Sequence, residues 1–385
     1  MKIFYICYED LSAQAAWTTH ISEVVKNLQR LGNEVVLFAP KIGKLQADIE
    51  TKSVYVPTVK VRLLNEYLYY FLLLFYLWAY QMRLRADIFY VREMGLSLSV
   101  ALVSRLFDVP HIIEVNGCAI EERTLVGISP RRILILRILQ RANFFLCNKI
   151  VIVADFIRDY LKTHYRVTDE NVVTIENGVN IELFRPADCK KTRERLGLSD
   201  DLYYITYVGS FYPHHALNHL VNLTRSLLER IENVRVLLVG DGHVKNEIED
   251  LVKELRLEKY ISFFGVVNYH DVPSFVNASD VCVILHLFPR EKGIISLKLL
   301  EYLSCGKPVV VNWKAFGGNL LSEKEIGIQI DLCNMEDAAD KIAQLLKDEA
   351  YREEIGRRGR EFIEANHSWQ KTAKEILKVC QSLKS

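Results

Sequence analysis

Residues 290–311 read REKGIISLKLLEYLSCGKPVVV, a loop that leads into a short helical segment and then into a buried strand. The apolar spacing predicts a helix that begins at Ser296 and ends at Cys305–Gly306. Unpaired N–H groups at the start of a helix attract phosphate. Lys298 could neutralise a diphosphate, and the carboxylate of Glu301 could accept hydrogen bonds from two ribose hydroxyls. A plain amphipathic helix, with Ser296 as its N-cap and Glu301 in solvent, accounts for the same residues. On the residues alone, the plain helix is the simpler interpretation.

The rest of the chain repeats this order of strand and helix. Short β-branched or aromatic runs alternate with stretches of helical period, such as Thr19–Leu31 with Gly32 as its stop. The order predicts the α/β class, with doubly wound parallel sheets covered by helices on both faces. The predicted strands are 3–7, 35–38, 88–91, 112–115, 150–153 and 172–175 in a first sheet, then 205–208, 234–239, 261–264, 281–285 and 309–311 in a second.

The length of 385 residues predicts two domains. Between the two series of strands, residues 182–201 are polar, charged and Pro-containing, which suits a linker, so we place the boundary near Leu196. The predicted domains are residues 1–195 and 196–365, followed by a C-terminal helix over 366–385. Two such sheets leave a cleft at the carboxyl ends of their strands, where ligands of these folds usually bind.

The pattern G-x-x-S-x-K-x-x-E-Y-x-x-x-G-K-P-V-V at 293–310 resembles the carboxy-terminal signature of the retaining GT-B glycosyltransferases of family 4, the glycosyl transferases group 1. Other segments resemble elements of this family, in the same order, over nearly the whole chain. They are IFYVRE at 88–93, IIEVNG at 112–117, ENGVNIELFRP at 176–186, YVGSF at 207–211, VLLVGDG at 236–242, FFGVV at 263–267 and SWQKTA at 368–373.

The resemblance implies two Rossmann-like domains that face a central cleft, with the donor in the second domain and the acceptor in the first. The closing helix would cross back to the first domain. The donor would be a nucleotide-sugar, such as a UDP- or GDP-sugar, with no metal and no cofactor, because a helix terminus and basic side chains can stabilise a leaving diphosphate.

The donor site that the resemblance implies is formed by loops and one helix of the second domain. Its residues are Gly209 and Ser210 near the diphosphate, Ser296 and Leu297 through backbone N–H groups, Lys298 beside the phosphates, Glu301 on the ribose hydroxyls and Val266 against the base.

Two positions on the donor side depart from the family pattern. Gly293 stands where many members have a Glu eight residues before the ribose Glu, and Glu291 is the catalytic candidate that could substitute for it. His214 and His215 replace the basic residues usual after the V-G-x loop, and we expect their charge to depend on pH near neutrality. A phosphate-binding role and an ordinary exposed loop both remain open for these histidines.

The acceptor side departs from the pattern at Asn116, which stands where a His near the reacting sugar is common. Asn116 is the second catalytic candidate, since an amide can orient a hydroxyl but cannot act as a general base. Retention without a protein nucleophile suggests attack on the face from which the diphosphate leaves, with a leaving phosphate oxygen accepting the proton. The acceptor-side candidates are His20, Arg92, Glu93, Glu114, Gly117 and Glu121, although a helix-surface His and a solvated acidic loop explain some of them equally well.

The longest apolar stretch, YLYYFLLLFYLWAY at 67–80, is too short for a transmembrane helix, because its length of about 21 Å falls below the thickness of a hydrocarbon core. It is either buried in the first domain or lies in a membrane interface. Residues 131–145 alternate Arg with apolar side chains in the same way. Segments 67–85 and 131–145 are therefore candidates for contact with an anionic membrane, and the acceptor would then be a lipid-linked saccharide or a growing polysaccharide.

The composition of the chain bears on its binding partners and on its compartment. The net charge is only +1, which argues against nucleic acid as a partner, but residues 51–150 carry 13 basic and 7 acidic side chains. The eight cysteines show neither C-x-x-C spacing nor a zinc pattern, which fits free thiols in a reducing compartment. We expect a cytoplasmic protein that is peripheral to the inner face of a membrane.

Two alternatives to a glycosyltransferase remain at this stage. A nucleotide-sugar 2-epimerase shares the two-sheet architecture and would convert the donor without an acceptor. A degenerate, non-catalytic homologue that binds a nucleotide-sugar is suggested by Gly293 and Asn116.

Overall fold

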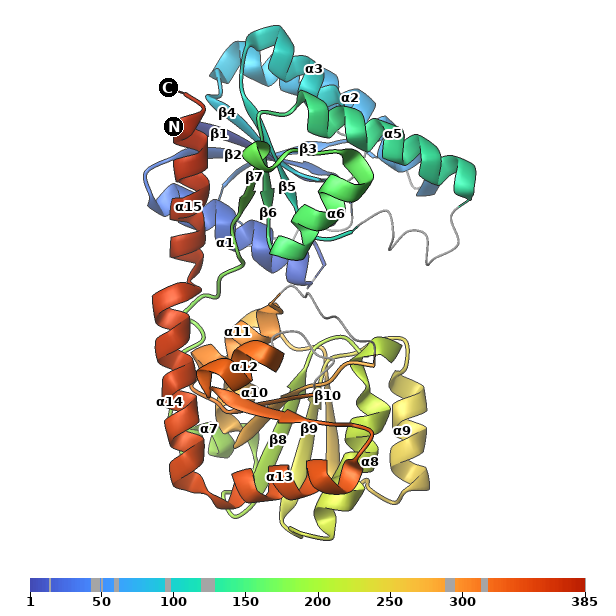
Figure 1. Cartoon of the computed structure of the whole chain (residues 1–385), viewed down its shortest axis with the longest axis vertical. Coiled ribbons are helices and arrows are strands. Elements are labelled where there is room, and N and C mark those ends of the chain that lie inside the picture. Colours follow the sequence, from blue (N-terminus) through green and yellow to red (C-terminus); the bar gives the residue numbers. More distant parts are fainter. Residues whose placement is uncertain are drawn as a thin grey trace. The chain divides into compact units, whose positions relative to one another are not determined.

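The computed structural model describes residues 1–384 except 14, 43–48, 50, 59–61, 94–97, 119–128, 288–294 and 313–317. The chain forms two compact units (Figure 1). Unit 1 joins Met1–Asn177 to Trp369–Ser385, and unit 2 is Gly178–Ser368. The chain therefore passes between the units twice, once after Asn177 and once before Trp369.

Unit 1 contains a seven-stranded parallel sheet in the order β3-β2-β1-β4-β5-β6-β7. Ile3 of the central strand β1 pairs with Val35 on one side and with Ile88 on the other. These strands are nearly continuous apolar runs because helices cover both faces of the sheet. The strands are β1 Lys2–Ile6, β2 Glu34–Pro40, β3 Lys52–Val56, β4 Ile88–Arg92, β5 His111–Val115, β6 Lys149–Ile152 and β7 Val172–Thr174.

The helices of unit 1 form two layers. One layer holds α1, which contacts the C-terminal helix α15, and the other holds α2, α3, α5 and α6, each in contact with the next (Figure 1). Right-handed crossovers on the two sides of β1 produce this arrangement. The helices are α1 Ala16–Arg30, α2 Arg62–Leu84, α3 Leu98–Phe107, α5 Pro130–Leu146, α6 Asp155–Tyr165 and α15 Trp369–Ser382, with a 3₁₀ turn η1 at Asp169–Asn171.

Unit 2 contains a six-stranded parallel sheet in the order β10-β9-β8-β11-β12-β13. Its strands are β8 Tyr203–Val208, β9 Val234–Val239, β10 Ile261–Gly265, β11 Val281–Ile284, β12 Val309–Asn312 and β13 Gly327–Ile330. Its helices are α7 Cys189–Leu196, α8 Leu217–Leu228, α9 Lys245–Glu254, α10 Val272–Ala278, α11 Leu297–Ser304, α12 Gly318–Lys324, α13 Met335–Lys347 and α14 Glu349–Asn366, with 3₁₀ turns η2 Pro213–His215 and η3 Tyr269–Asp271.

Two apolar cores lie on the two faces of the unit 2 sheet. One core includes Leu220 of α8 and Ile342 of α13, and the other includes Leu299 and Leu303 of α11 with Ile363 of α14. The apolar side of α11 is thus packed in the core. Its polar residues Lys298 and Glu301 are only partly buried and lie on the other side of the helix.

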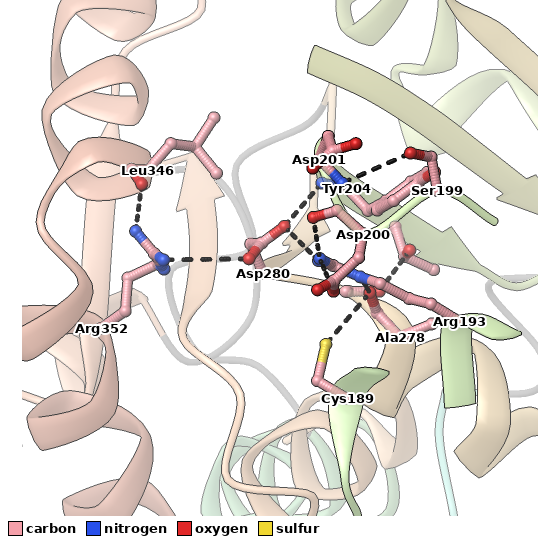
Figure 2. A network of polar contacts seen from close by, with 12 residues as sticks. Cys189, Arg193, Ser199, Asp200, Asp201, Tyr204, Ala278, Asp280, Leu346 and Arg352 are labelled. Atoms are coloured by element: carbon pink, nitrogen blue, oxygen red, sulfur yellow. Dashed lines mark hydrogen bonds and ion pairs between the residues drawn. The ribbon is translucent and has the colours of Figure 1, made fainter. Parts of the chain in front are cut away.

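A buried arginine fastens α7 to the unit 2 sheet (Figure 2). The guanidinium of Arg193 donates to the carbonyl of Ala278 at 2.9 Å, to Asp280 at 2.7 Å and to Asp200 at 3.3 Å. Asp280 also accepts the backbone N–H of Tyr204 at 2.7 Å and faces Arg352 of α14 at 3.8 Å. One carboxylate therefore links α7, the start of β8 and α14.

The fold class predicted from the sequence is confirmed, because both sheets are parallel and doubly wound. The sequence did not predict β3 and β13, which are edge strands with mixed polar and apolar residues and so give a weak periodic signal. The expectation that the C-terminal helix returns to the first unit is confirmed, since α15 packs on α1.

No helix in the described part of the chain is long and apolar enough to span a membrane.

Replacing Arg193 by Ala leaves Asp280, whose side chain is only 13% exposed, without its main partner, so we expect the free energy of unfolding of unit 2 to fall by about 3–5 kcal/mol. Native-state hydrogen exchange of the β8 and β11 amides measures this loss. Arg195→Ala is the matched control, because Arg195 is exposed on the same helix, and its effect should stay within about 0.5 kcal/mol. Equal effects of the two substitutions would contradict the assigned role of Arg193.

Candidate active site

Three loops interlock at the carboxyl ends of β8, β9 and β10, and glycines make this possible. The N–H of Gly209 bonds to Val239 O at 2.9 Å, and the N–H of Gly240 bonds to Gly265 O at 2.7 Å. Gly240 has φ +136°, and a Cβ there would lie 1.9 Å from the carbonyl oxygen of Gly209. Gly242 is equally crowded, because its Cβ would lie 2.5 Å from Phe211 O. Only glycine fits at these two positions, so the backbone of the β8 loop is held in one place.

The start of α11 is fixed against this loop. Ser296 caps the helix, since its hydroxyl accepts the N–H of Leu299 at 3.3 Å. The buried hydroxyl of Tyr302 accepts the N–H of Val208 at 2.8 Å and donates to Val208 O at 3.3 Å. The N–H groups of Leu297 and Lys298 belong to the first helical turn, which offers no intrahelical acceptor. An anion at this terminus would meet these groups and the positive end of the helix dipole.

Lys298 lies between Gly209 and Tyr207. Its Nζ is 3.3 Å from the Tyr207 hydroxyl and 4.6 Å from the centre of the ring, and a Cβ on Gly209 would approach Nζ to 2.7 Å. Burial lowers the pKa of Lys298 to about 8, although the nearby Glu301 opposes this shift. An anionic ligand would therefore meet a poorly hydrated ammonium group, whose attraction for phosphate is stronger than that of an exposed lysine.

Glu301 lies one turn further along α11 and is half-buried rather than fully solvated. Burial raises the pKa of Glu301 to about 7, against the opposing effects of Lys298 and of a hydrogen bond from the Tyr269 side chain. A carboxyl group that is half-ionised at neutral pH gains when a ligand donates hydroxyl hydrogen bonds to it, because these bonds favour the charged form. The site thus pairs a desolvated cation with a desolvated carboxylate.

His215 belongs to the same cluster. Contrary to our expectation from the sequence, its pKa does not lie near neutrality. Its Nδ1 lies 2.6 Å from Ser210 O and 2.9 Å from the Tyr207 hydroxyl. Because the carbonyl can only accept, Nδ1 carries a hydrogen and Nε2 is the acceptor of the neutral ring. Burial and the charge of Lys298 lower the pKa of His215 to about 3, so the ring is neutral at pH 7.

A third histidine, His286, was missed by the sequence reasoning. It lies two residues after the end of β11, is buried, and its ring centre lies 5.2 Å from that of His214. Asn312 at the end of β12 fixes its backbone through two hydrogen bonds of 2.9 and 2.8 Å. Its position just after an apolar strand was the available signal. The described residues contain no group of three or more His, Cys, Asp or Glu side chains arranged to hold a metal ion.

Two donor-side candidates lie at the surface. Val266, predicted to contact the base, is 64% exposed just after β10, and Ser210 is exposed at the tip of the β8 loop. Glu291 and Gly293 fall within 288–294 and lie outside the described residues.

In unit 1 the carboxylate of Glu114 is the centre of a buried polar cluster. It is 1% exposed and lies 2.7 Å from His20 Nε2, and it accepts from Arg92 at 3.3 Å, from Asn116 at 2.5 Å and from the Tyr90 hydroxyl at 2.6 Å. Burial alone would raise its pKa, but these partners outweigh burial and lower the pKa of Glu114 to about 2. Glu114 is therefore a fixed anion inside the protein.

His20 connects this cluster to the two places where the chain passes between the units. It is buried on α1 rather than exposed on the helix surface. Its Nδ1 lies 3.0 Å from Asn177 Oδ1, and its ring meets Trp369 edge-on at 5.1 Å between ring centres. Asn177 and Trp369 are the residues at which the chain leaves and re-enters unit 1.

The remaining acceptor-side candidates lie around the same cluster. Asn116 and Gly117 are half-buried just after β5, and Arg92 is the last residue of β4. Glu93 is buried, and its backbone N–H donates a hydrogen bond to the carbonyl oxygen of Glu114 at 2.8 Å. Glu121 falls within 119–128, outside the described residues. The structure thus brings His20, Arg92, Glu114 and Asn116 together, and separately Gly209, Ser210, His215, Lys298 and Glu301.

Two family models match in succession and together span most of the chain. They are Glycosyltransferase Family 4 over residues 18–183 and Glycosyl transferases group 1 over residues 188–362. The chain belongs to the family 4 glycosyltransferases, which are retaining enzymes. The resemblance noted in the sequence is confirmed.

Relatives of this family 4 chain are 22–26% identical to it over the regions that align. An uncharacterized glycosyltransferase of Methanocaldococcus jannaschii is 25% identical over 60% of this chain and 59% of its own length. A D-inositol 3-phosphate glycosyltransferase of Saccharomonospora viridis is 26% identical over 60% of this chain and 55% of its own. A GDP-mannose-dependent monoacylated α-(1-6)-phosphatidylinositol monomannoside mannosyltransferase of Corynebacterium glutamicum is 22% identical over 54% of this chain and 55% of its own. The chain thus matches 55–59% of the length of these relatives.

Solved structures confirm the GT-B fold of this family 4 chain. The sucrose-phosphate synthase of Thermosynechococcus elongatus superposes with a TM-score of 0.79 at 19% identity, over 99% of this chain and 98% of that one. An Anabaena protein in complex with UDP-glucose superposes with a TM-score of 0.74 at 16% identity, over 99% and 100% of the two chains.

The pKa of Glu114 generates a prediction on acid stability. The folded pKa of about 2 lies below the ordinary value of 4.5, so this group stabilises unit 1 above pH 4.5 and the stabilisation disappears as the pH falls toward 2. The shift corresponds to about 3 kcal/mol in the free energy of unfolding. Glu114→Gln resembles the protonated group, so wild type and variant should differ at pH 7 and converge in acid. Chemical denaturation at a series of pH values tests this, and a difference that is constant with pH would contradict it.

Proposed function

We propose that this chain transfers a sugar from a nucleotide-sugar donor to a hydroxyl acceptor, with retention of the anomeric configuration and without a metal ion. The observation that carries the proposal is the pairing of Lys298 and Glu301, one turn apart on α11 and both desolvated, at the carboxyl end of β8. Family membership supports the reaction class.

The proposed donor site follows from the chemistry of these groups. The diphosphate binds the N–H groups of Leu297 and Lys298 and the ammonium group of Lys298, while the small residue Gly209 lets it approach the backbone. The ribose hydroxyls donate to Glu301, and the base lies against the exposed Val266. A UDP- or GDP-sugar fits this division of roles, and the Anabaena structure with UDP-glucose supports a nucleoside-diphosphate sugar as the donor class.

The same cations serve the proposed chemistry. As the bond between the sugar and the diphosphate breaks, negative charge grows on the leaving oxygen, and Lys298 with the α11 terminus stabilises it in place of a metal ion. His215 is neutral and offers Nε2 as an acceptor, so it orients a hydroxyl rather than supplying charge. We further propose Glu291 for the role of the missing Glu at position 293.

On the acceptor side we assign Glu114 an indirect role. Both of its oxygens are occupied by protein partners and its pKa of about 2 makes it a very weak base. Glu114 therefore orients the Asn116 amide, whose Oδ1 accepts a hydrogen bond from a hydroxyl of the acceptor other than the attacking one. Attack occurs on the face from which the diphosphate leaves, and the leaving phosphate oxygen takes the proton of the hydroxyl. The protein contributes placement and charge stabilisation.

We propose a saccharide carried on a lipid or a growing polymer as the acceptor. The name of the Corynebacterium glutamicum relative places a phosphatidylinositol glycan in that role, whereas the Saccharomonospora viridis relative is named for a small inositol phosphate. The acceptors named for these relatives thus differ, and the acceptor of this chain is identified by the screen described next.

The reaction is tested by incubating the chain with each nucleotide-sugar that raises its melting temperature, with and without lipid-linked and polymeric acceptors. A glycoside of retained anomeric configuration, formed only when acceptor is present, is the expected product. Conversion of the nucleotide-sugar alone would identify an epimerase, and donor binding without turnover on any acceptor would identify a non-catalytic homologue.

Glu301→Ala tests the ribose assignment. Losing a charged acceptor for hydroxyl hydrogen bonds costs about 1.5–3 kcal/mol, so the Kd for the donor should rise about 10- to 150-fold in titration calorimetry. The melting temperature of the unliganded variant should not fall at pH 8, because a carboxyl whose folded pKa is raised does not stabilise the fold there. Glu258→Ala, an exposed carboxylate of unit 2, is the control and should bind normally. Unchanged affinity in Glu301→Ala would refute the assignment.

A further inference from the structure

We propose that the outer face of α2, α3 and α5 docks on an anionic membrane surface. In the described part of the chain, fifteen large apolar side chains are exposed, and eleven of them lie on these three helices: five on α2, two on α3 and four on α5. Helix α3 contacts both α2 and α5, so the three helices form one layer of unit 1 (Figure 1). A concentration of this size marks an interaction surface rather than ordinary surface composition.

Helix α2 is apolar on both sides. Its inner side is anchored by Tyr69, Leu73 and Leu77, which are buried, and the Tyr69 hydroxyl donates to Cys7 O at 2.7 Å. On the outer side a single stripe at helical spacing is 45–60% exposed, and it consists of Tyr67, Phe71, Phe75, Trp78 and Met82. The inner side of this helix is therefore buried in unit 1, and the exposed outer side is the one that the proposal places at the membrane. The exposed stripe is aromatic, as expected at the boundary between lipid head groups and chains.

Helix α5 carries a mixed stripe of arginine and apolar residues. Leu134, Ile135, Ile138 and Phe145 are 53–84% exposed. Arg131, Arg137 and Arg141 are exposed among them. Leu102, Arg105 and Leu106 continue the same composition on α3. Such a helix places its apolar side chains at the acyl boundary while its guanidinium groups reach lipid phosphates.

The charge of this layer selects its partner. The sequences of α2, α3 and α5 contain seven arginines and a single acid, Glu66, which is buried. A second copy of the chain on the same face would place these arginines against their own equivalents, because a two-fold interface brings identical patches together. An anionic bilayer instead provides phosphates for the arginines and a hydrocarbon boundary for the aromatic stripe. The helices lie on this surface, since none in the described part can span it. The proposal does not depend on the reaction proposed above.

Co-sedimentation of the full chain with phosphatidylcholine vesicles, with and without phosphatidylglycerol, tests the docking. We expect binding to the anionic vesicles that weakens as salt is added, because salt screens exposed charges. Arg137→Glu with Arg141→Glu should weaken this binding at least about 25-fold, at about fivefold for each arginine near an anionic surface. The matched control is Lys374→Glu with Lys378→Glu, which makes the same charge change at the same helical spacing on exposed positions of α15 and should bind like the wild type.

The aromatic stripe is tested separately by Phe75→Ser with Trp78→Ser, against Tyr351→Ser on unit 2 as the control. The double variant should lose vesicle binding at low salt while keeping the melting temperature of the wild type, because both side chains are half-exposed. Failure of the wild type to sediment with anionic vesicles, or equal losses in the α15 control, would overturn the proposal. A dimer in sedimentation velocity that the α5 and α2 variants abolish would also overturn it, because the face would then pair copies of the chain.

Discussion

The burial of Lys298 against Tyr207 and Gly209 is the constraint on which the proposed donor site depends. The ammonium group has little water and is packed so closely that any side chain at position 209 would meet it. Gly240 and Gly242 in turn hold the Gly209 loop in place. A cation kept in such surroundings is poised for an anion, and the helix terminus of α11 supplies further donors at the same point.

The two units use the carboxyl ends of their strands differently. In unit 2, Lys298 and Glu301 have pKa values displaced toward neutrality, so their charge states respond to a ligand. In unit 1, Glu114 is saturated by protein donors and its pKa is far below neutrality, so it acts as a rigid support. His20 joins that support to Asn177 and Trp369, where the chain passes between the units. In the proposed reaction, one unit binds charged groups of the donor and the other positions a neutral amide.

The alternation of strands and helices was predictable because its period is local, and the α11 signature was predictable because its residues are neighbours in sequence. The edge strand β13 was missed since its four residues, GIQI, lack a clear pattern. The roles of Tyr302 and His286 were missed because each depends on a partner from another strand, Val208 in one case and Asn312 in the other. The buried state of Glu114 also came only from the structure, since sequence spacing cannot show which donors surround a carboxylate.

The central claim is that a nucleotide-sugar binds through the ionised forms of Lys298 and Glu301, and proton exchange on binding tests it most directly. The diphosphate of a nucleotide-sugar lacks a phosphate monoester that titrates near pH 6, so exchanged protons report on the protein. With pKa values of about 8 and about 7, calorimetry in buffers of different ionisation enthalpy should show proton release below pH 7 and proton uptake above pH 8. Binding heats that are independent of the buffer on both sides of neutrality would contradict the account.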